Sequence, residues 1–507
     1  MYSLYSIVKG LPLLAGMVLA AADYPTIPSD LTTPTQQRLA MSGLNSVSVG
    51  WNTYEQLDEP CVEYGTTTSM SLKSCSTISV TYNTSRTWSN TVILTDLTPA
   101  TTYYYQIVST NSTMQTFFSA RTPGDKTAFT VNAVIDLGVY GSDGYTVDSA
   151  DDSSRKLGIP DVDPSLNHTT IGRLQDTFDD FEFVIHPGDF GYADDWYLTP
   201  SNANDGVNAY EAILEEFYNQ LAPIAGGKLY MASPGNHEAD CEELGTITIE
   251  AVCPEGQKNF TDFNVRFGQN MPTSFASTSS STKAKVNANK AASLAKPPFW
   301  YSFEYGMIHV TMIDTETDFP DAPDEPYGSS GLDGGPFGYD GQQMDFFEAD
   351  LASVDRTVTP WLIVAGHRPF YSTGISNTCS ACKAAFEGLM YQYGVDLGIF
   401  GHVHNSQRFA PIYNGTLDPN GTNDPTMPMY IIAGGAGNIE GTTPVGTNVT
   451  GNQFAYAQDF SYATLTFQDE NNLEINFIDS SSGAVLDTSS LYKSHTEQFV
   501  NQSESSA

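Results

Sequence analysis

Residues 181–192, FEFVIHPGDFGY, join an apolar run to a segment in which Asp189 and Tyr192 stand beside glycines. The run Phe181–Ile185 has the length and composition of a buried strand, and Gly188 lets the backbone turn sharply after it. In an open α/β sheet, ligands gather where the strands end. We therefore expect Asp189 and Tyr192 to face a site at the end of this strand.

Further strand-like runs alternate with helical spacing along the rest of the chain. Apolar residues between 210 and 221 follow 3–4 spacing, which indicates an amphipathic helix. Continuous apolar strands that alternate with helices predict a buried α/β sheet. The region from Asp459 has a hairpin pattern, and the Ser/Thr/Ala/Lys-rich stretch 273–296 is expected to be a mobile loop. The other expected strands are Phe129–Ile135, Lys228–Ala232, Met307–Ile313, Trp361–Ala365, Val395–Phe400 and Met429–Ala433.

Residues 31–123 show a different, all-β pattern of short runs between turn residues. The segment Leu97–Tyr105, LTPATTYYY, resembles the corner of fibronectin type III sandwiches, where a tyrosine hydrogen-bonds back across the turn. The predicted layout is a β-sandwich over 23–125 and an α/β catalytic domain over 126–495, which includes a C-terminal segment, 455–495. Residues 496–507 are expected to be disordered.

The first 22 residues predict export. A short apolar run after Lys9 closes on Ala20–Ala22 like a signal peptide, and it is too short to cross a bilayer. Cysteine spacing suggests the local disulfides Cys61–Cys75, Cys241–Cys253 and Cys379–Cys382, although other pairings are possible. A secreted glycoprotein, extracellular or in the cell wall, is therefore expected. N-glycosylation sequons stand at Asn83, Asn111, Asn167, Asn259, Asn414, Asn420, Asn448 and Asn501.

The charge balance excludes some partners. The 507 residues include 59 Asp and Glu against 21 Lys and Arg, which gives a net charge of −38. Nucleic acids and anionic membranes bind basic surfaces, so neither is an expected partner. A charged fraction of only 16% with 12% aromatic residues predicts a sizeable folded core rather than a disordered chain.

Five motifs at strand ends carry the donor atoms of a metal site. A lone histidine is more often a core or surface residue than a ligand, but five such motifs in order are not a coincidence. Their two Asp, one Asn, three His and one Tyr supply enough donors for two metals that share one carboxylate. Such a pair, ~3.5–4 Å apart, can activate a water and clamp a phosphoryl group. The motifs are Asp136-Leu137-Gly138, Gly188-Asp189-Phe190-Gly191-Tyr192, Gly235-Asn236-His237-Glu238, Val364-Ala365-Gly366-His367 and Gly401-His402-Val403-His404.

These motifs resemble the DxG, GDxxY, GNH(D/E), VxxH and GHxH blocks of the purple acid phosphatases, a family of calcineurin-like metallophosphoesterases. The resemblance extends to the N-terminal sandwich and the C-terminal segment, and Tyr192 is its most specific feature. It implies a dinuclear centre in which Asp189 bridges Fe(III) and a second divalent metal, either Zn, Fe or Mn. The implied Fe(III) ligands are Asp136, Asp189, Tyr192 and His404, and the second metal is completed by Asn236, His367 and His402.

The resemblance also implies an activity. The expected function is a secreted acid phosphatase that hydrolyses small phosphate monoesters, with metal-bound hydroxide as the nucleophile. His237 is expected to bind phosphate and to protonate the leaving alkoxide. Glu238 either orients His237 or is an ordinary loop carboxylate. His186 and His309 match family positions that are not ligands, so both are interpreted as structural.

Some positions depart from the plant members of this family, and alternatives stay open. Residues 371–377, YSTGISN, lack additional substrate histidines, and Asn405–Arg408 replaces the usual aromatic-Glu-Arg tail. The same ligands would serve a phosphodiesterase, a nucleotide pyrophosphatase or a phytase. A different class is a non-catalytic, glycosylated binding protein, and a redox role for Cys379–Cys382 is a further alternative. The sequence does not indicate an oligomeric state.

Overall fold

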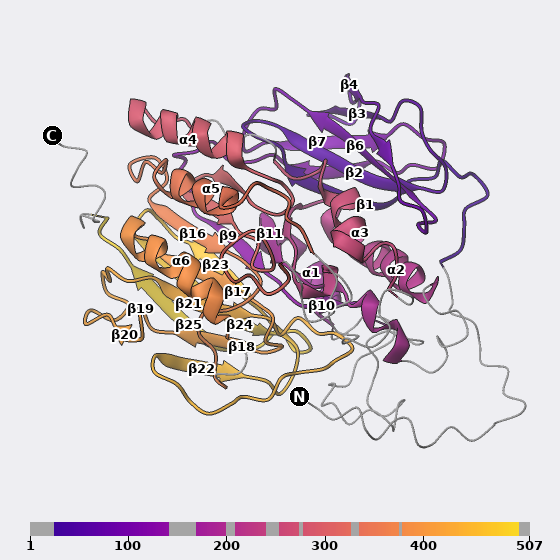
Figure 1. The fold of residues 1–507 in the computed structure, drawn as a ribbon. Coiled ribbons are helices and arrows are strands. Elements are labelled where there is room, and N and C mark those ends of the chain that lie inside the picture. The colour runs from indigo at the N-terminus through magenta and orange to yellow at the C-terminus, as the bar shows by residue number, and fades with distance from the viewer. Residues whose placement is uncertain are drawn as a thin grey trace, which may run out of the picture.

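The computed structural model describes residues 25–140, 169–198, 208–239, 253–272, 277–325, 334–374 and 378–495, except for the side chains of 196–198. Figure 1 shows a β-rich N-terminal part beside a larger part in which helices cover the strands. The predicted signal peptide 1–22 and the predicted disordered tail 496–507 lie outside the described residues, as do Asn167, Cys241 and Asn501.

Short strands in two layers build the N-terminal part. The first layer has the order β1-β2-β6-β5 and the second β4-β3-β7-β8. The backbone N–H of Thr98 donates to Tyr103 Oη at 2.9 Å, so the predicted tyrosine corner is present. The strands are β1 (Thr35–Met41), β2 (Val47–Thr53), β3 (Cys61–Gly65), β4 (Leu72–Cys75), β5 (Ser79–Val80), β6 (Trp88–Leu94), β7 (Thr102–Ile107) and β8 (Gln115–Phe118).

The first sheet of the α/β part continues the first layer of the N-terminal part. Its strands β9, β11 and β13 run parallel, and β1 joins β13 in parallel through Leu39 and Leu229. The antiparallel strands β23, β24 and β25 complete the order β25-β24-β23-β9-β11-β13-β1-β2-β6-β5, which confirms the predicted C-terminal hairpin. The bounds are β9 (Phe129–Ala133), β11 (Phe183–Pro187), β13 (Leu229–Ser233), β23 (Ser461–Phe467), β24 (Asn472–Asp479) and β25 (Val485–Tyr492).

Side chains reinforce the junction between β1 and β13. Arg38 donates through Nε and Nη2 to the carbonyl of Arg266 at 3.2 and 3.0 Å. Tyr82 Oη donates to the carboxylate of Glu211 at 2.6 Å. Burial raises the pKa of Glu211 to about 7. The N-terminal part is thus held by a shared sheet and buried polar contacts as well as by the chain connection.

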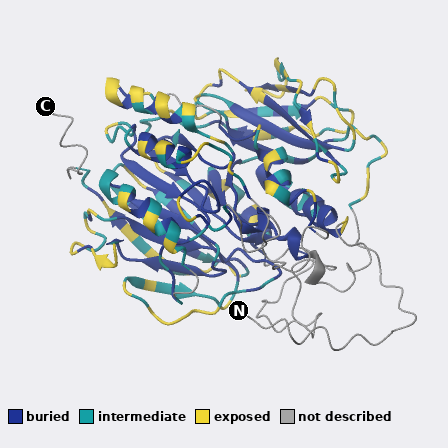
Figure 2. Ribbon diagram, in the orientation of Figure 1, coloured by how far each residue is buried: buried dark blue, intermediate teal, exposed yellow. Residues whose placement is uncertain are grey.

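The second sheet is buried on both faces and packs against the first. Its order is β14-β15-β16-β17-β21-β18-β22. In β16, Ile363 packs toward the first sheet, whereas Leu362 and Val364 pack with the helices α5 and α6. Figure 2 shows this core as buried strands under helices with exposed outer faces. The bounds are β14 (Tyr301–Tyr305), β15 (Ile308–Met312), β16 (Trp361–Ala365), β17 (Leu397–Phe400), β18 (Ser406–Phe409), β21 (Met429–Ala433), β22 (Asn452–Tyr456), α5 (Gln342–Leu351) and α6 (Ser380–Tyr393).

The remaining elements cover the sheets and connect them. The predicted amphipathic helix is α2, whose apolar face packs into the core of the first sheet. No helix among the described residues is long and apolar enough to span a membrane. These elements are α1 (Thr170–Asp176), α2 (Asn208–Ala225), α3 (Thr261–Phe267), η2 (Phe178–Asp180), η3 (Ala193–Leu198), η5 (Asn236–Glu238), η8 (Lys258–Phe260), β10 (Leu137–Gly138), β12 (Phe190–Gly191), β19 (Ile412–Tyr413) and β20 (Thr416–Leu417).

The expectation of a mobile loop over 273–296 is wrong, because Thr282–Leu294 form helix α4. The Ser281 side chain caps this helix by accepting from the N–H of Ala284. Ala284, Ala288 and Ala291 form a buried stripe, and α4 lies beside α5 (Figure 1). Alanine has the highest helix propensity but gives little hydropathic contrast. Composition therefore resembled a loop where the structure has a helix.

Candidate metal centre

The predicted ligands meet at the carboxyl ends of parallel strands from both sheets. Four of the residues in these motifs have left-handed backbone, with φ between 54° and 65°. Left-handed backbone costs ~1–3 kcal/mol at a non-glycine residue and persists only where the surroundings hold it. The four residues are Asp136, Asp189, Tyr192 and His402. Asp136 follows β9, Asp189 follows β11, Tyr192 follows β12, Asn236 follows β13, His367 follows β16, and His402 and His404 follow β17.

Two glycines allow these strand ends to approach one another. A Cβ atom on Gly188 would lie 2.4 Å from His367 Nδ1, and one on Gly235 would lie 2.3 Å from Asp189 Oδ1. Both distances are shorter than any that a real Cβ atom tolerates. Glycine is therefore required at both positions for the shared carboxylate and the histidine to come together.

One group of donors surrounds the phenol oxygen of Tyr192. This Oη atom lies 3.1 Å from Asp189 Oδ2 and 3.3 Å from Asp136 Oδ1. His404 Nε2 is 2.9 Å from the same Oη atom. All four side chains are buried. This is the set that the family resemblance implies for Fe(III).

A second group surrounds the amide oxygen of Asn236. Its Oδ1 atom lies 2.9 Å from His367 Nε2 and 2.8 Å from His402 Nδ1. His367 Nε2 is also 3.1 Å from Asp189 Oδ2. The structure thus brings together the set that the family resemblance implies for the second metal.

The two groups share Asp189, and their chemistry fits two metal ions. Donor atoms of Asp189, His367 and His402 lie within 4.8 Å of one another, and so do those of Asp136, Asp189 and His404. Asp136 Oδ2 is buried and has no hydrogen-bond partner among the described residues. A buried carboxylate oxygen without a partner is costly unless a cation binds it. Carboxylate, phenol, amide and imidazole donors suit iron, zinc and manganese.

The electrostatics of the site also favour cations. Burial and the neighbouring Asp189 push the pKa of Asp136 well above its usual range. Burial, Asp136 and Asp189 likewise raise the pKa of Tyr192. Burial lowers the pKa of His404 to about 4, which keeps its imidazole neutral, as metal coordination requires. Bound cations would offset the repulsion among the anionic donors and favour the deprotonated carboxyl and phenol.

His237 stands beside these donors but is held by a residue that the motifs do not contain. Its Nδ1 atom lies 2.9 and 3.0 Å from the two carboxylate oxygens of Asp194. Its ring packs on Tyr192 with 4.1 Å between centroids, and its Nε2 atom lies 4.0 Å from Asp189 Oδ2. Asp194 comes from η3, directly after the GDxxY motif, and is buried. Its proximity to that motif was the only available sequence signal.

Comparisons with known protein sequences identify the family of this chain. Family models match residues 34–122 as "Purple acid Phosphatase, N-terminal domain", 167–406 as "Calcineurin-like phosphoesterase" and 427–488 as "Iron/zinc purple acid phosphatase-like protein C". Acid phosphatase A of Cryphonectria parasitica is 78% identical over 99% of this chain and 100% of its own. The chain belongs to the purple acid phosphatase family.

More distant similarities are found in sequence and in structure. A nucleotide pyrophosphatase/phosphodiesterase of Hordeum vulgare is 28% identical over 66% of this chain and 77% of its own. The solved structure of the purple acid phosphatase PPD1 from yellow lupin seeds superposes with a TM-score of 0.62 at 22% identity, covering 91% of this chain and 75% of the lupin chain. The predicted N-terminal all-β part and metallophosphoesterase fold are confirmed.

The carboxylate of Glu238 contacts backbone groups of the loops around the site. Its carboxylate accepts the backbone N–H groups of Asp189 at 2.9 Å, Phe190 at 2.8 Å and Gly235 at 2.8 Å. Asp194, rather than Glu238, therefore orients the ring of His237. Glu238 ties together the two loops that carry Asp189 and Asn236.

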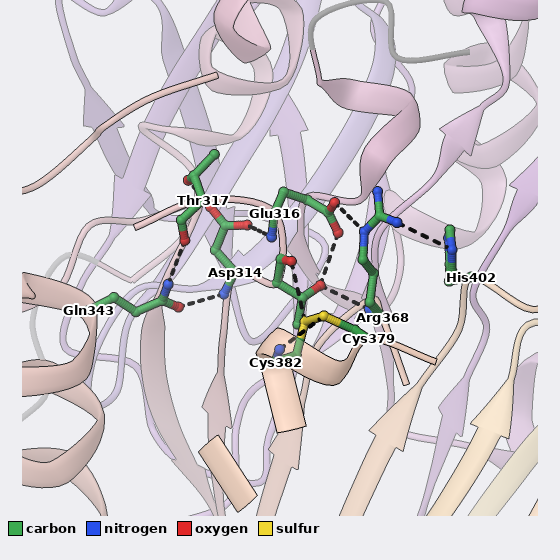
Figure 3. The surroundings of a disulfide bond; sticks show 9 residues. Asp314, Glu316, Thr317, Gln343, Arg368, Cys379, Cys382 and His402 are labelled. Atoms are coloured by element: carbon green, nitrogen blue, oxygen red, sulfur yellow. Dashed lines mark hydrogen bonds and ion pairs between the residues drawn. A yellow bond between two sulfur atoms is a disulfide. The ribbon is translucent and has the colours of Figure 1, made fainter. Parts of the chain in front are cut away.

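Arg368, directly after His367, lies beside His402 (Figure 3). Its Nε atom donates to Glu316 Oε2 at 2.6 Å, and its Nη1 atom is 3.4 Å from His402 Nε2. Its backbone N–H donates to Thr315 Oγ1 at 2.9 Å. The guanidinium thus lies beside the ligand His402, and the sequence analysis did not single it out.

The two histidines interpreted as structural have contacts with protein groups. His186 Nδ1 lies 2.7 Å from Tyr230 Oη, and His309 Nε2 lies 3.0 Å from Asp350 Oδ2. The interpretation of both as structural residues is consistent with these buried contacts.

Most of the predicted disulfide cysteines and sequon asparagines lie in the part of the chain that the structure describes. Disulfides join Cys61 to Cys75 and Cys379 to Cys382. Cys253 is disulfide-bonded, and its predicted partner Cys241 lies outside the described residues. The sequon asparagines that the structure describes all have exposed side chains, so sugar attachment would meet no steric barrier. They are Asn83, Asn111, Asn259, Asn414, Asn420 and Asn448.

Proposed function

We propose that this chain is an acid phosphatase that hydrolyses phosphate monoesters at a dinuclear metal centre. The observation that carries the proposal is the pair of donor groups that share Asp189. The 78% identity with Acid phosphatase A supports the activity. The proposed domain layout is the one predicted from the sequence, with a positioning sandwich over 23–125 and a catalytic domain over 126–495.

Asp136, Asp189, Tyr192 and His404 would hold Fe(III), and Asn236, His367 and His402 would join Asp189 around a second divalent ion, Zn, Fe or Mn. The phenol of Tyr192 supports iron, because an anionic phenolate favours a hard, highly charged ion. The printed description "Iron/zinc" of the matched C-terminal family agrees with this choice. Bound metals would supply Lewis acidity toward a phosphoryl oxygen and an activated water as nucleophile.

The protein's own residues would bind the substrate and move the proton. Asp194 accepts from His237 Nδ1, so the Nε2 atom faces the shared carboxylate, where the ester would lie. From that position Nε2 can donate a hydrogen bond to phosphate and a proton to the leaving alkoxide. The three backbone N–H groups that donate to the Glu238 carboxylate would keep the loops of Asp189 and Asn236 in a fixed position during this step.

A second candidate is cleavage of phosphodiesters or nucleotide pyrophosphates at the same site. The barley relative named nucleotide pyrophosphatase/phosphodiesterase favours it. Phytate hydrolysis is a special case of the monoesterase. A panel of monoesters, diesters, diphosphates and phytate at acid and neutral pH would rank these substrates by kcat/KM.

We also propose secretion and N-glycosylation. The predicted signal peptide, the disulfides and the exposed sequon asparagines support both. Mass spectrometry of the secreted protein, before and after removal of N-glycans, would show which sequons carry sugar. A mature chain that begins with the apolar run after Lys9 would contradict cleavage near residue 22.

Metal analysis and visible absorption of the purified protein test the proposed function. We expect two metals per chain, one of them iron, a purple colour and hydrolysis of p-nitrophenyl phosphate in acid. Tyr192→Phe should lose colour and iron. Tyr301→Phe is the matched control, because it removes a buried hydroxyl that donates to Ala232 O at 2.7 Å in the core. Folded protein without bound metal would instead support a non-catalytic binding protein.

A further inference from the structure

We propose that Arg368 and the Nε2 side of His402 form a second anion site, which selects substrates with a second phosphate next to the reacting phosphoryl group. The inference rests on the proposed function, because it assumes that a metal occupies the group around Asn236. It assigns a specificity role to Arg368, next in the chain to His367.

Arg368 is held firmly from one side. Its backbone N–H donates to Thr315 Oγ1, and its Nε donates to Glu316 Oε2 at 2.6 Å. The Glu316 side chain is fully buried, whereas that of Arg368 is 12% exposed. A charge-assisted hydrogen bond to a buried carboxylate fixes the plane of the guanidinium. In this orientation Nη1 faces the His402 ring at 3.4 Å, as Figure 3 shows.

A metal on His402 Nδ1 would turn the Nε2 atom that faces Arg368 from a hydrogen-bond acceptor into a donor. His402 Nδ1 lies 2.8 Å from Asn236 Oδ1 and Nε2 lies 3.4 Å from Arg368 Nη1, so a ring with its proton on Nδ1 would accept from Arg368 at Nε2. A neutral imidazole whose Nδ1 binds a metal carries the proton on Nε2 instead. The guanidinium has only donors. Two donors then lie 3.4 Å apart, and an anionic oxygen beside the pair, within hydrogen-bond reach of both nitrogens, satisfies both.

The position of His402 Nε2 and Arg368 Nη1 indicates which part of a substrate would bind beside them. The two nitrogens of the His402 ring point in opposite directions, Nδ1 into the donor group and Nε2 away from it. An anion beside Nε2 therefore lies outside the metal pocket, beyond the phosphoryl group under attack. His402 and Arg368 are partly exposed, whereas the other ligands are buried. This edge is thus where a second phosphate of the same substrate would lie.

A purely structural ion pair is the competing interpretation. Arg121 and Glu182 form such a pair at 2.6 Å, and the Arg121 side chain is also 12% exposed. The Arg121–Glu182 and Arg368–Glu316 pairs differ in the group that lies against the arginine side chain. Arg121 packs over the ring of Phe118, whereas Arg368 faces a metal ligand. Arg121→Gln is therefore a matched control for Arg368→Gln.

The test compares two non-hydrolysable ligands by calorimetric titration of metal-loaded protein. Methylenediphosphonate carries a second phosphoryl group, and methylphosphonate does not. We expect Arg368→Gln to weaken diphosphonate binding by about 10-fold to 100-fold, the range of a charge-assisted hydrogen bond, with little change for methylphosphonate. Arg368→Lys should fall between Gln and wild type. Arg121→Gln should bind both ligands like wild type.

Glu316→Gln separates the two interpretations further, since it breaks the ion pair but keeps the cation. We expect it to retain diphosphonate binding, whereas a structural pair predicts equal losses for Glu316→Gln and Arg368→Gln. Equal weakening of both ligands by Arg368→Gln and Arg368→Lys, or no weakening, would overturn the inference. Thermal unfolding checks that each variant is folded. Failure of metal-loaded wild type to hydrolyse p-nitrophenyl phosphate would count against the proposed function, whereas the ratio of the two affinities decides the anion site.

Discussion

Replacing Asp194 with asparagine tests whether His237 delivers the proton to the leaving group. Both carboxylate oxygens lie within 3.0 Å of His237 Nδ1, and both residues are buried. Hydrogen bonds to charged groups contribute about 1.5–3 kcal/mol, so kcat should fall by about 10-fold to 150-fold. Asparagine can also present its NH₂ group to Nδ1, which would keep Nδ1 unprotonated and disfavour the imidazolium form that acts as the acid.

The assay compares an alkyl phosphate with p-nitrophenyl phosphate, because only the alkoxide needs a proton to leave. We expect Asp194→Asn to lose more activity on the alkyl ester, with metal content and visible absorption unchanged. Asp350→Asn is the control, since it removes a buried Asp–His contact at 3.0 Å outside the site. It should lower the unfolding temperature and leave the ratio of the two rates unchanged. Equal losses on both esters would refute proton delivery by His237.

Three further predictions concern the support of the site. Glu238→Gln leaves at least one of three backbone N–H groups without its acceptor, so the free energy of unfolding should fall by about 1–3 kcal/mol and metal should be lost more readily on dialysis. Gly235→Ala puts a Cβ atom 2.3 Å from Asp189 Oδ1, so elemental analysis should show loss of both metals, whereas Gly388→Ala, with no atom within 4 Å, should keep them. Because burial raises the pKa of Glu211 to about 7, its stabilising contribution is full below the unfolded value near 4.5 and is lost as pH rises through 7. Denaturant unfolding at several pH values should show Glu211→Gln flattening this fall, which amounts to about 3 kcal/mol, while Glu216→Gln leaves the fall unchanged.

The donor groups could be predicted because each ligand follows an apolar strand and a short glycine motif. Such motifs are local in sequence, and parallel strands bring their ends together without further information. Asp194 and Glu316 could not be found in this way. Asp194 lies in the short 3-10 helix η3, which has no motif of its own. Glu316 meets Arg368 only because two neighbouring strands of the second sheet end side by side.

In the fold, too, features set by local sequence could be predicted, whereas contacts between residues far apart in sequence could not. The strands over Trp361–Ala365 and Met429–Ala433 were predicted with their observed bounds, because buried strands are continuous apolar runs. Helix α4 was missed because its buried stripe is alanine. The pairing of β1 with β13 was also not predicted, since Leu39 and Leu229 are far apart in sequence. Only tertiary packing decides such a contact.

The junction of β1 with β13 determines how the molecule should come apart. A β-sandwich that is joined only by a flexible linker unfolds independently. Here a single ten-stranded sheet continues across the boundary between the two parts. The buried bonds of Arg38 and Tyr82 reach into the catalytic part across it. Both halves should therefore lose their structure in one cooperative transition, with matching amide-exchange protection on either side. Excising the sandwich would expose an unpaired edge of β13 and favour aggregation.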